Sequence, residues 1–350
     1  MPLARALRLL PPETAHTLAL KGVRWAAAWS PTAKPAADPE LETNLAGLHL
    51  AHPIGLAAGF DKNAVAASAL FRLGFALVEV GTVTLHPQTG NPRPRIFRLS
   101  EDRAIINRLG FNNAGLEAAK SNLMHAAQRS GPLGINIGIN KTTTTPLDDY
   151  SKVLSELAPW VDYATINVSS PNTPGLRTWQ HGDQLKALLQ RVAEVRDETR
   201  AELPLFLKLA PDLARDDEPL IVETALECGI QGLIVSNTTL SRPSSLCSRN
   251  RTEAGGLSGA PLFEPSTAQL RRMARHAKGR LALIGVGGVF SGADAYAKIR
   301  AGAAAVQLYT ALIYRGPGAI NAILSELKAC LESDGFKTVG EAIGADLSMS

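Results

Sequence analysis

The chain has 350 residues, of which 45% are hydrophobic and 19% are charged. This balance is typical of a folded protein with a large core, and it excludes a disordered chain, a collagen and a coiled coil. The three cysteines are widely spaced, which excludes a disulfide framework and favours a reducing compartment. The formal net charge is +4 and its excess lies within residues 1–34, so the sequence offers no basic stripe for nucleic acid.

Residues 1–40 predict an N-terminal helical appendage followed by a linker. A first short helix is expected before the Pro11-Pro12 pair, and a second helix is expected to begin near Glu13. Trp25 and Trp29 lie near the end of this second helix beside basic residues, which is typical of a helix at a membrane surface. A helical hairpin packed on its own domain or on a partner subunit is the alternative. The expected apolar face consists of Ala15, Leu18, Ala19, Val23 and Ala26.

Residues 41–340 predict a (β/α)8 TIM barrel, and residues 341–350 are expected to form a C-terminal tail. Short apolar strands alternate with helical patterns, which is typical of a parallel sheet, and eight such units close naturally into a barrel. An open doubly wound sheet is less favoured, because no Gly-rich first turn is followed by an acidic residue at the expected spacing. The predicted strands are Ile54–Ala58, Ala76–Val80, Gly134–Ile139, Tyr163–Val168, Leu205–Leu209, Gly232–Ser236, Leu281–Gly285 and Ala304–Leu308.

Polar residues follow nearly every predicted strand. In a barrel these strand ends converge on one mouth, where catalytic groups lie. The Gly285-Val-Gly-Gly288 turn after the seventh strand and Tyr309-Thr310 after the eighth predict a phosphate site built from backbone N–H groups. The Gly255–Gly259 segment offers another close approach of backbone to a ligand.

The side chains expected at the mouth are mostly uncharged amides. No His pair or acidic cluster has metal-ligand spacing, so no metal site is expected. Amides both donate and accept hydrogen bonds, which suits a neutral ring with alternating N–H and C=O groups, such as a pyrimidine-like imide. Lys208 fits three roles from its residue type alone: a Schiff base, a positive charge beside a flavin, or a salt bridge, for example to Asp212. The amides are Asn107, Asn112, Asn136, Asn167, Asn172 and Asn237.

These motifs resemble those of the class 2, quinone-linked dihydroorotate dehydrogenases, over nearly all of residues 1–330. The run through Ser170 is the most specific, and class 1 relatives carry Cys where this chain has Ser170. The resembling segments are Gly55–Lys62, Glu79–Thr82, Pro92–Arg98, Ile106–Asn113, Gly134–Gly138, Ile166–Arg177, Lys208–Asp212, Ser236–Thr239, Gly255–Gly259 and Ile284–Gly288.

The resemblance implies oxidation of dihydroorotate to orotate with FMN, in pyrimidine biosynthesis. It implies that Ser170 is the base, with Thr173 and water near Phe111 as a proton relay, and that hydride passes to the flavin. The implied substrate contacts are Lys62, Asn107, Arg108, Leu109, Gly110, Phe111, Asn167, Asn172, Asn237 and Thr238. The implied FMN contacts are Ala58, Gly59, Phe60, Asp61, Lys62, Thr82, Asn136, Asn167, Lys208, Ser236, Gly259, Gly288, Tyr309 and Thr310.

The resemblance also gives the N-terminal helices a role. It implies that they line a tunnel for ubiquinone or menaquinone, with His16, Arg95 and Tyr309 as polar contacts. It further implies a peripheral membrane protein, on the cytoplasmic side of the inner membrane if the source is bacterial. A class 1 enzyme, a Schiff-base aldolase using Lys208 and a non-catalytic flavin carrier are the rival functions.

Overall fold

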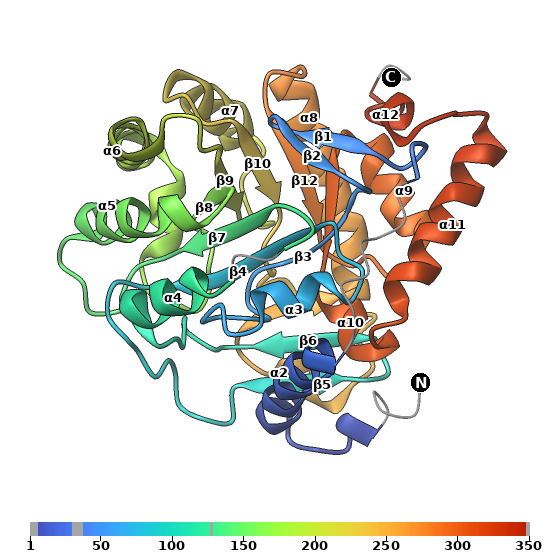
Figure 1. Cartoon of the computed structure of the whole chain (residues 1–350), viewed down its shortest axis with the longest axis horizontal. Helices are drawn as coiled ribbons and strands as arrows, with labels where there is room; N and C mark the ends of the chain where they lie inside the picture. Colours follow the sequence, from blue (N-terminus) through green and yellow to red (C-terminus); the bar gives the residue numbers. More distant parts are fainter. Residues whose placement is uncertain (1–5, 30–37, 127–128, 348–350) are drawn as a thin grey trace.

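The centre of the computed structural model, which describes residues 6–29, 38–126 and 129–347, is a closed barrel of parallel strands (Figure 1). The barrel closes where the last strand pairs with the first, with Val306 opposite Ile54. The predicted TIM barrel is therefore confirmed, and each predicted strand is present; Leu205–Leu209 has the predicted ends, and the other strands have slightly shifted ends. The barrel strands are β3 (Ile54–Leu56), β4 (Leu77–Val83), β7 (Leu133–Ile137), β8 (Tyr163–Asn167), β9 (Leu205–Leu209), β10 (Gly232–Val235), β12 (Ala282–Val286) and β13 (Ala305–Leu308).

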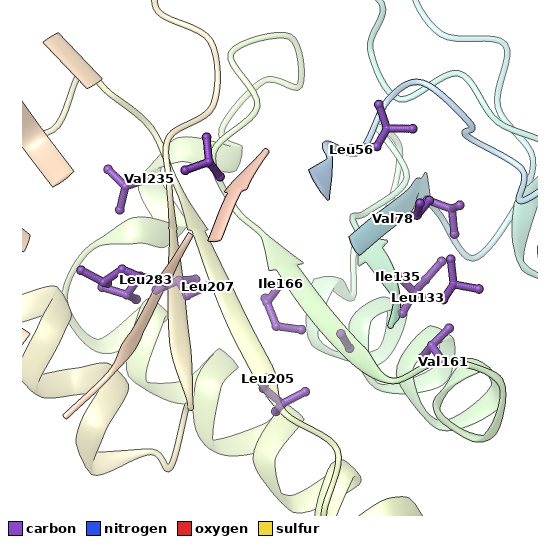
Figure 2. Close-up of a cluster of buried hydrophobic side chains, with 14 of the residues drawn as sticks. Leu56, Val78, Leu133, Ile135, Val161, Ile166, Leu205, Leu207, Val235 and Leu283 are labelled. Atoms are coloured by element: carbon purple, nitrogen blue, oxygen red, sulfur yellow. The ribbon is translucent and has the colours of Figure 1, made fainter. Parts of the chain in front are cut away.

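Helices surround the barrel and bury the outward faces of its strands. Successive residues of a strand point to opposite faces, so alternate apolar residues such as Leu205 and Leu207 pack under the helices (Figure 2). This layer between strands and helices is the main hydrophobic core. The helices are α3 (Ala67–Phe71), α4 (Gly115–Met124), α5 (Pro146–Leu157), α6 (Gly182–Arg200), α7 (Asp217–Glu227), α8 (Phe263–Ala277), α9 (Gly292–Arg300), α10 (Thr310–Arg315), α11 (Ala319–Asp334) and α12 (Val339–Ala342).

The interior of the barrel is apolar near the amino-terminal ends of its strands. Tyr163 and Phe206 fill it, and their rings meet edge to face at 5.4 Å. The hairpin of β1 (Thr43–Leu45) and β2 (Leu48–Leu50) adds its leucines to the same cluster. Gly134 leaves room for the Tyr163 ring, because a Cβ there would lie 2.0 Å from Tyr163 Cζ. The hairpin therefore closes this end, and a ligand has to enter from the other end.

Next to this apolar cluster, toward the carboxyl ends of the strands, lies a polar layer that is centred on the fully buried carboxylate of Glu79. Glu79 accepts hydrogen bonds from Asn136 Nδ2 at 2.7 Å, from Gln307 Nε2 at 2.8 Å and from the Tyr163 hydroxyl at 3.2 Å. Lys208 Nζ lies 3.7 Å from Glu79 Oε1. Four barrel strands other than that of Glu79 thus send a donor to one carboxylate.

Two elements outside the barrel cover its open end. The first is an antiparallel sheet of three strands, which was not predicted from the sequence. Its strands are β5 (Ile96–Leu99), β6 (Ala104–Asn107) and β11 (Gly256–Gly259). The N-terminal helix α2 (Pro12–Trp29) packs against β5 and α3, beside this sheet (Figure 1).

The ends of the chain are described in part. The first predicted helix extends into residues 1–5, and most of the predicted linker falls on residues 30–37; both ranges lie outside the described residues. At the other end, Gly344 N donates to Ile299 O and Asp346 N donates to Arg300 O, which attaches the last described residues to α9.

We expect Glu79→Ala to lower the free energy of unfolding by about 3–5 kcal/mol, because it leaves the Lys208 ammonium buried without its partner. Denaturant unfolding would measure this. The control is Glu194→Ala, which removes an exposed ion pair with Arg191 and should cost less than about 0.5 kcal/mol. Equal effects of the two substitutions would contradict the role assigned to Glu79.

Candidate active site

A cavity of about 710 Å³ opens above the polar layer of the barrel. Its walls come from the ends of the barrel strands, from β6 and β11, and from one face of α2. Each residue of the predicted apolar face of α2 lines this cavity, so the face covers the site rather than a separate core. The cavity thus has a polar end inside the barrel and an apolar end under α2.

Ser170 lies in the cavity wall just after β8 and is only 6% exposed. Its Oγ accepts a hydrogen bond from Asn172 N at 3.2 Å, which leaves the hydroxyl proton available to another acceptor. Asn172 Nδ2 in turn donates to Asn107 O at 3.2 Å. The loop that carries Ser170 is thereby attached to the strand β6.

The amides beside Ser170 are fixed by hydrogen bonds to one another. Asn167 Nδ2 donates to Asn136 Oδ1 at 2.9 Å and to Thr82 Oγ1 at 3.3 Å. Thr82 Oγ1 donates to Asn136 Oδ1 at 2.6 Å, and Asn136 is bonded to Glu79 below. This chain orients the lining side chains Thr82 and Asn167 before any ligand arrives.

Arg177 joins three loops at the mouth, a role that the sequence analysis missed. Its guanidinium donates to Ser169 O at 3.1 Å, to Asp212 Oδ2 at 2.7 Å and to Thr238 O at 2.9 Å. Asp212 was considered as a salt-bridge partner of Lys208; it pairs with Arg177, and Lys208 lies against Glu79 instead. The planar guanidinium suits this task because its N–H groups point in several fixed directions.

At the apolar end, an aromatic row runs from α2 into the barrel. The His16 and Phe60 rings lie 5.1 Å apart edge to face, and Phe60 lies 6.2 Å from Tyr309. Burial, reinforced by the charge of Lys62, lowers the pKa of His16 to about 4, so this imidazole is neutral at pH 7. Burial also lowers the pKa of Lys62 to about 8, which leaves it mostly charged at pH 7.

Glu13 attaches α2 to the barrel. Its carboxylate accepts from Arg95 Nε at 2.9 Å and Arg95 Nη2 at 3.0 Å, and Arg93 lies 3.0 Å away. Burial alone would raise the pKa of Glu13, but the two arginines outweigh it and the net shift is downward. Arg95 is buried by this contact and does not line the cavity.

Most of the predicted site residues line this one cavity. Five do not, and one of these is Asn112, whose buried Oδ1 has no hydrogen-bond partner among the described residues. Arg95 binds Glu13, Arg108 pairs with Glu253 at 2.7 Å, and Asn136 lies one hydrogen bond behind the wall. The Asp61 carboxylate accepts from Val65 N at 2.9 Å and Ala66 N at 2.7 Å. Those that line it are His16, Ala58, Gly59, Phe60, Lys62, Thr82, Asn107, Leu109, Gly110, Phe111, Asn167, Ser170, Asn172, Lys208, Ser236, Asn237, Thr238, Gly259, Gly288, Tyr309 and Thr310.

The polar end of the cavity has unpaired and charged groups that could bind a polar ligand. Gln307 lines it, and its buried Oε1 has no hydrogen-bond partner among the described residues. Lys208 supplies a positive charge at the polar end, and glycines and hydroxyls gather at Gly259, Gly288 and Thr310. Within the described ranges, no group of three or more His, Cys, Asp or Glu side chains could hold a metal ion.

Known proteins share this sequence and fold. A family model described as dihydroorotate dehydrogenase matches residues 40–331. "Dihydroorotate dehydrogenase (quinone)" of Rhodospirillum rubrum is 51% identical over 339 residues, covering 96% of this chain and 92% of that protein. The protein of the same name from Parvibaculum lavamentivorans is 49% identical, covering 99% of each chain.

Solved structures agree with the sequence matches. The crystal structure of a dihydroorotate dehydrogenase from Eimeria tenella in complex with ferulenol has a TM-score of 0.90 and 43% identity, and 96% of each chain is covered. A ligand-free structure from the same organism has a TM-score of 0.89, with 94% of this chain and 98% of that chain covered. The chain therefore belongs to the dihydroorotate dehydrogenase family of flavin-dependent (β/α)8-barrel oxidoreductases.

Proposed function

We propose that this chain oxidises dihydroorotate to orotate with bound FMN and passes the electrons to a membrane quinone. The observation that carries the proposal is that Ser170, the neutral amides and Lys208 share one cavity whose other end is apolar and lies under α2. The names of the quinone-linked relatives support the same activity. Bound FMN would supply the acceptor for the hydride that leaves C6 of the substrate.

The residues of the polar end have separate tasks in this proposal. Ser170 takes the proton from C5 of dihydroorotate, and Lys62 meets the substrate carboxylate. The amides Asn107, Asn172 and Asn237 bind the N–H and C=O groups of the ring, since an amide can donate to one and accept from the other. A lone hydroxyl is a weak base, so the proton has to leave through a relay, for which buried Thr173, three residues further along the chain, is the candidate.

FMN fits the remaining wall residues. Thr82, Asn167 and Ser236 line the cavity and would bind the polar groups of its ring, and Lys208 would supply positive charge for the electron-rich reduced form. Barrel enzymes commonly bind phosphate in the loops after the last two strands. Here Gly288 follows β12, Thr310 follows β13, and Gly259 at the end of β11 lines the same cavity.

The quinone would enter under α2, where His16 and Tyr309 offer polar contacts beside apolar walls. Leu18 and Trp25 on α2 are 45% and 69% exposed, near the basic Lys21 and Arg24. An apolar surface with basic neighbours suits the interface of a membrane, which in a bacterium would be the cytoplasmic face of the inner membrane. Within the described residues, no helix has the length and hydropathy needed to cross a bilayer.

We expect Ser170→Ala to retain bound flavin but to slow its anaerobic reduction by dihydroorotate about 100-fold or more, because the proton acceptor is gone. Stopped-flow measurement of the flavin absorbance would test this. Ser155→Ala, which changes an exposed hydroxyl on α5, is the matched control. Reduction of the Ser170 variant at the rate of the control would refute the assignment of the base.

We expect Ala19→Trp to obstruct the apolar end of the cavity. Quinone reduction should slow by roughly tenfold or more, because the quinone can no longer reach its productive position. Flavin reduction by dihydroorotate should stay unchanged. Thr17→Trp places the same side chain on an exposed position of α2 outside the cavity and is the control. An equal loss in both half-reactions would contradict a separate quinone entrance.

A further inference from the structure

Lys298 of α9 is completely buried, which is unusual for a lysine. Its Nζ donates to Ser266 Oγ at 2.9 Å and to Thr267 Oγ1 at 3.0 Å, and it lies 5.4 Å from the centre of the Phe263 ring. Across the described parts of the chain, no carboxylate forms an ion pair with it. A buried charge without a partner is costly, so this ammonium calls for an anion that the chain itself does not supply.

The position of Lys298 indicates where that anion would bind. The side chain passes behind β12, since a Cβ at Gly285 would lie 3.0 Å from Lys298 Cδ. Ser266 Oγ, which receives the hydrogen bond from Lys298, has two carbonyl acceptors for its single proton, Phe263 O at 3.1 Å and Gly287 O at 3.2 Å. Gly287 and Gly288 line the cavity. One hydroxyl and one peptide group therefore separate the buried ammonium from the cavity wall.

We propose that Lys298 is a positioning residue for the phosphate of the flavin nucleotide, acting through Ser266 and the Gly287–Gly288 turn. This inference rests on the proposed binding of FMN. The turn follows the seventh barrel strand, where barrel enzymes commonly bind phosphate. Charges in a protein interior are screened less than in water, so a cation behind the turn favours an anion in front of it.

The charged groups that bear on Lys298 are Asp294 of its own helix and Glu264 of α8. Burial outweighs both and lowers the pKa of Lys298 to about 7. A bound phosphate would raise this pKa again, because it favours the charged ammonium. Phosphate binding should therefore be supported when Lys298 is protonated and should weaken as the pH rises above 7.

The test compares FMN with riboflavin, which lacks the phosphate, as ligands of the flavin-free full-length chain. We expect Lys298→Met to raise the Kd of FMN about tenfold and that of riboflavin by less than about twofold. Lys186→Met, which removes an exposed lysine paired with Glu227, is the control and should change neither. An equal loss for both flavins, or no loss for FMN, would overturn the role of Lys298.

A second measurement does not depend on the folding of a variant. In the unmodified chain, the preference for FMN over riboflavin should fall from pH 7 to pH 9, where the phosphate itself stays fully charged because its second pKa is about 6. A constant preference would overturn the inference while leaving the proposed function intact. Failure of the unmodified chain to bind either flavin would refute both.

Discussion

The carboxylate of Glu79 organises the polar groups inside the barrel. It lies between an apolar floor, filled by Tyr163 and Phe206, and the cavity above. A carboxylate accepts only, so each neighbour has to turn a donor toward it, and this fixes the orientation of Asn136 and of Gln307. Asn136 then presents its own acceptor to the next layer. The order of the cavity wall thus begins at one buried charge that does not itself line the cavity.

The same carboxylate keeps Lys208 in place at the polar end. Glu79 Oε1 lies 3.7 Å from Lys208 Nζ, so this buried ammonium has a partner of opposite charge inside the barrel. The charges of Glu79 and Lys208 therefore offset each other, and Lys208 still lines the cavity.

The sequence predicted those features that follow from local pattern and barrel geometry. Ser170, Asn167 and Lys208 lie at strand ends, and parallel strands in a barrel bring such ends together, so their shared cavity could be expected. Glu79 and Arg177 lie within resembling segments but were given no role, because their partners come from distant parts of the chain. The addition of β11 to its sheet was missed for the same reason, because Gly256 pairs with Asn107, far away in sequence; the β5–β6 hairpin, with Leu99 opposite Ala104, is local and was overlooked. Asp61 is the opposite case, because it was assigned to the FMN site but binds two backbone N–H groups only a few residues away. This local role of an aspartate that caps a turn could have been predicted from the sequence.

The exposed apolar side chains of the N-terminal appendage have a consequence for the protein in plain buffer. Leu9, Leu18 and Trp25 are 88%, 45% and 69% exposed on the same N-terminal appendage. When neither lipid nor detergent covers these apolar side chains, they can be removed from water by packing against a second copy of this chain. The appendage would then promote concentration-dependent clustering, and a mild detergent would keep the molecules dispersed by occupying the place of lipid.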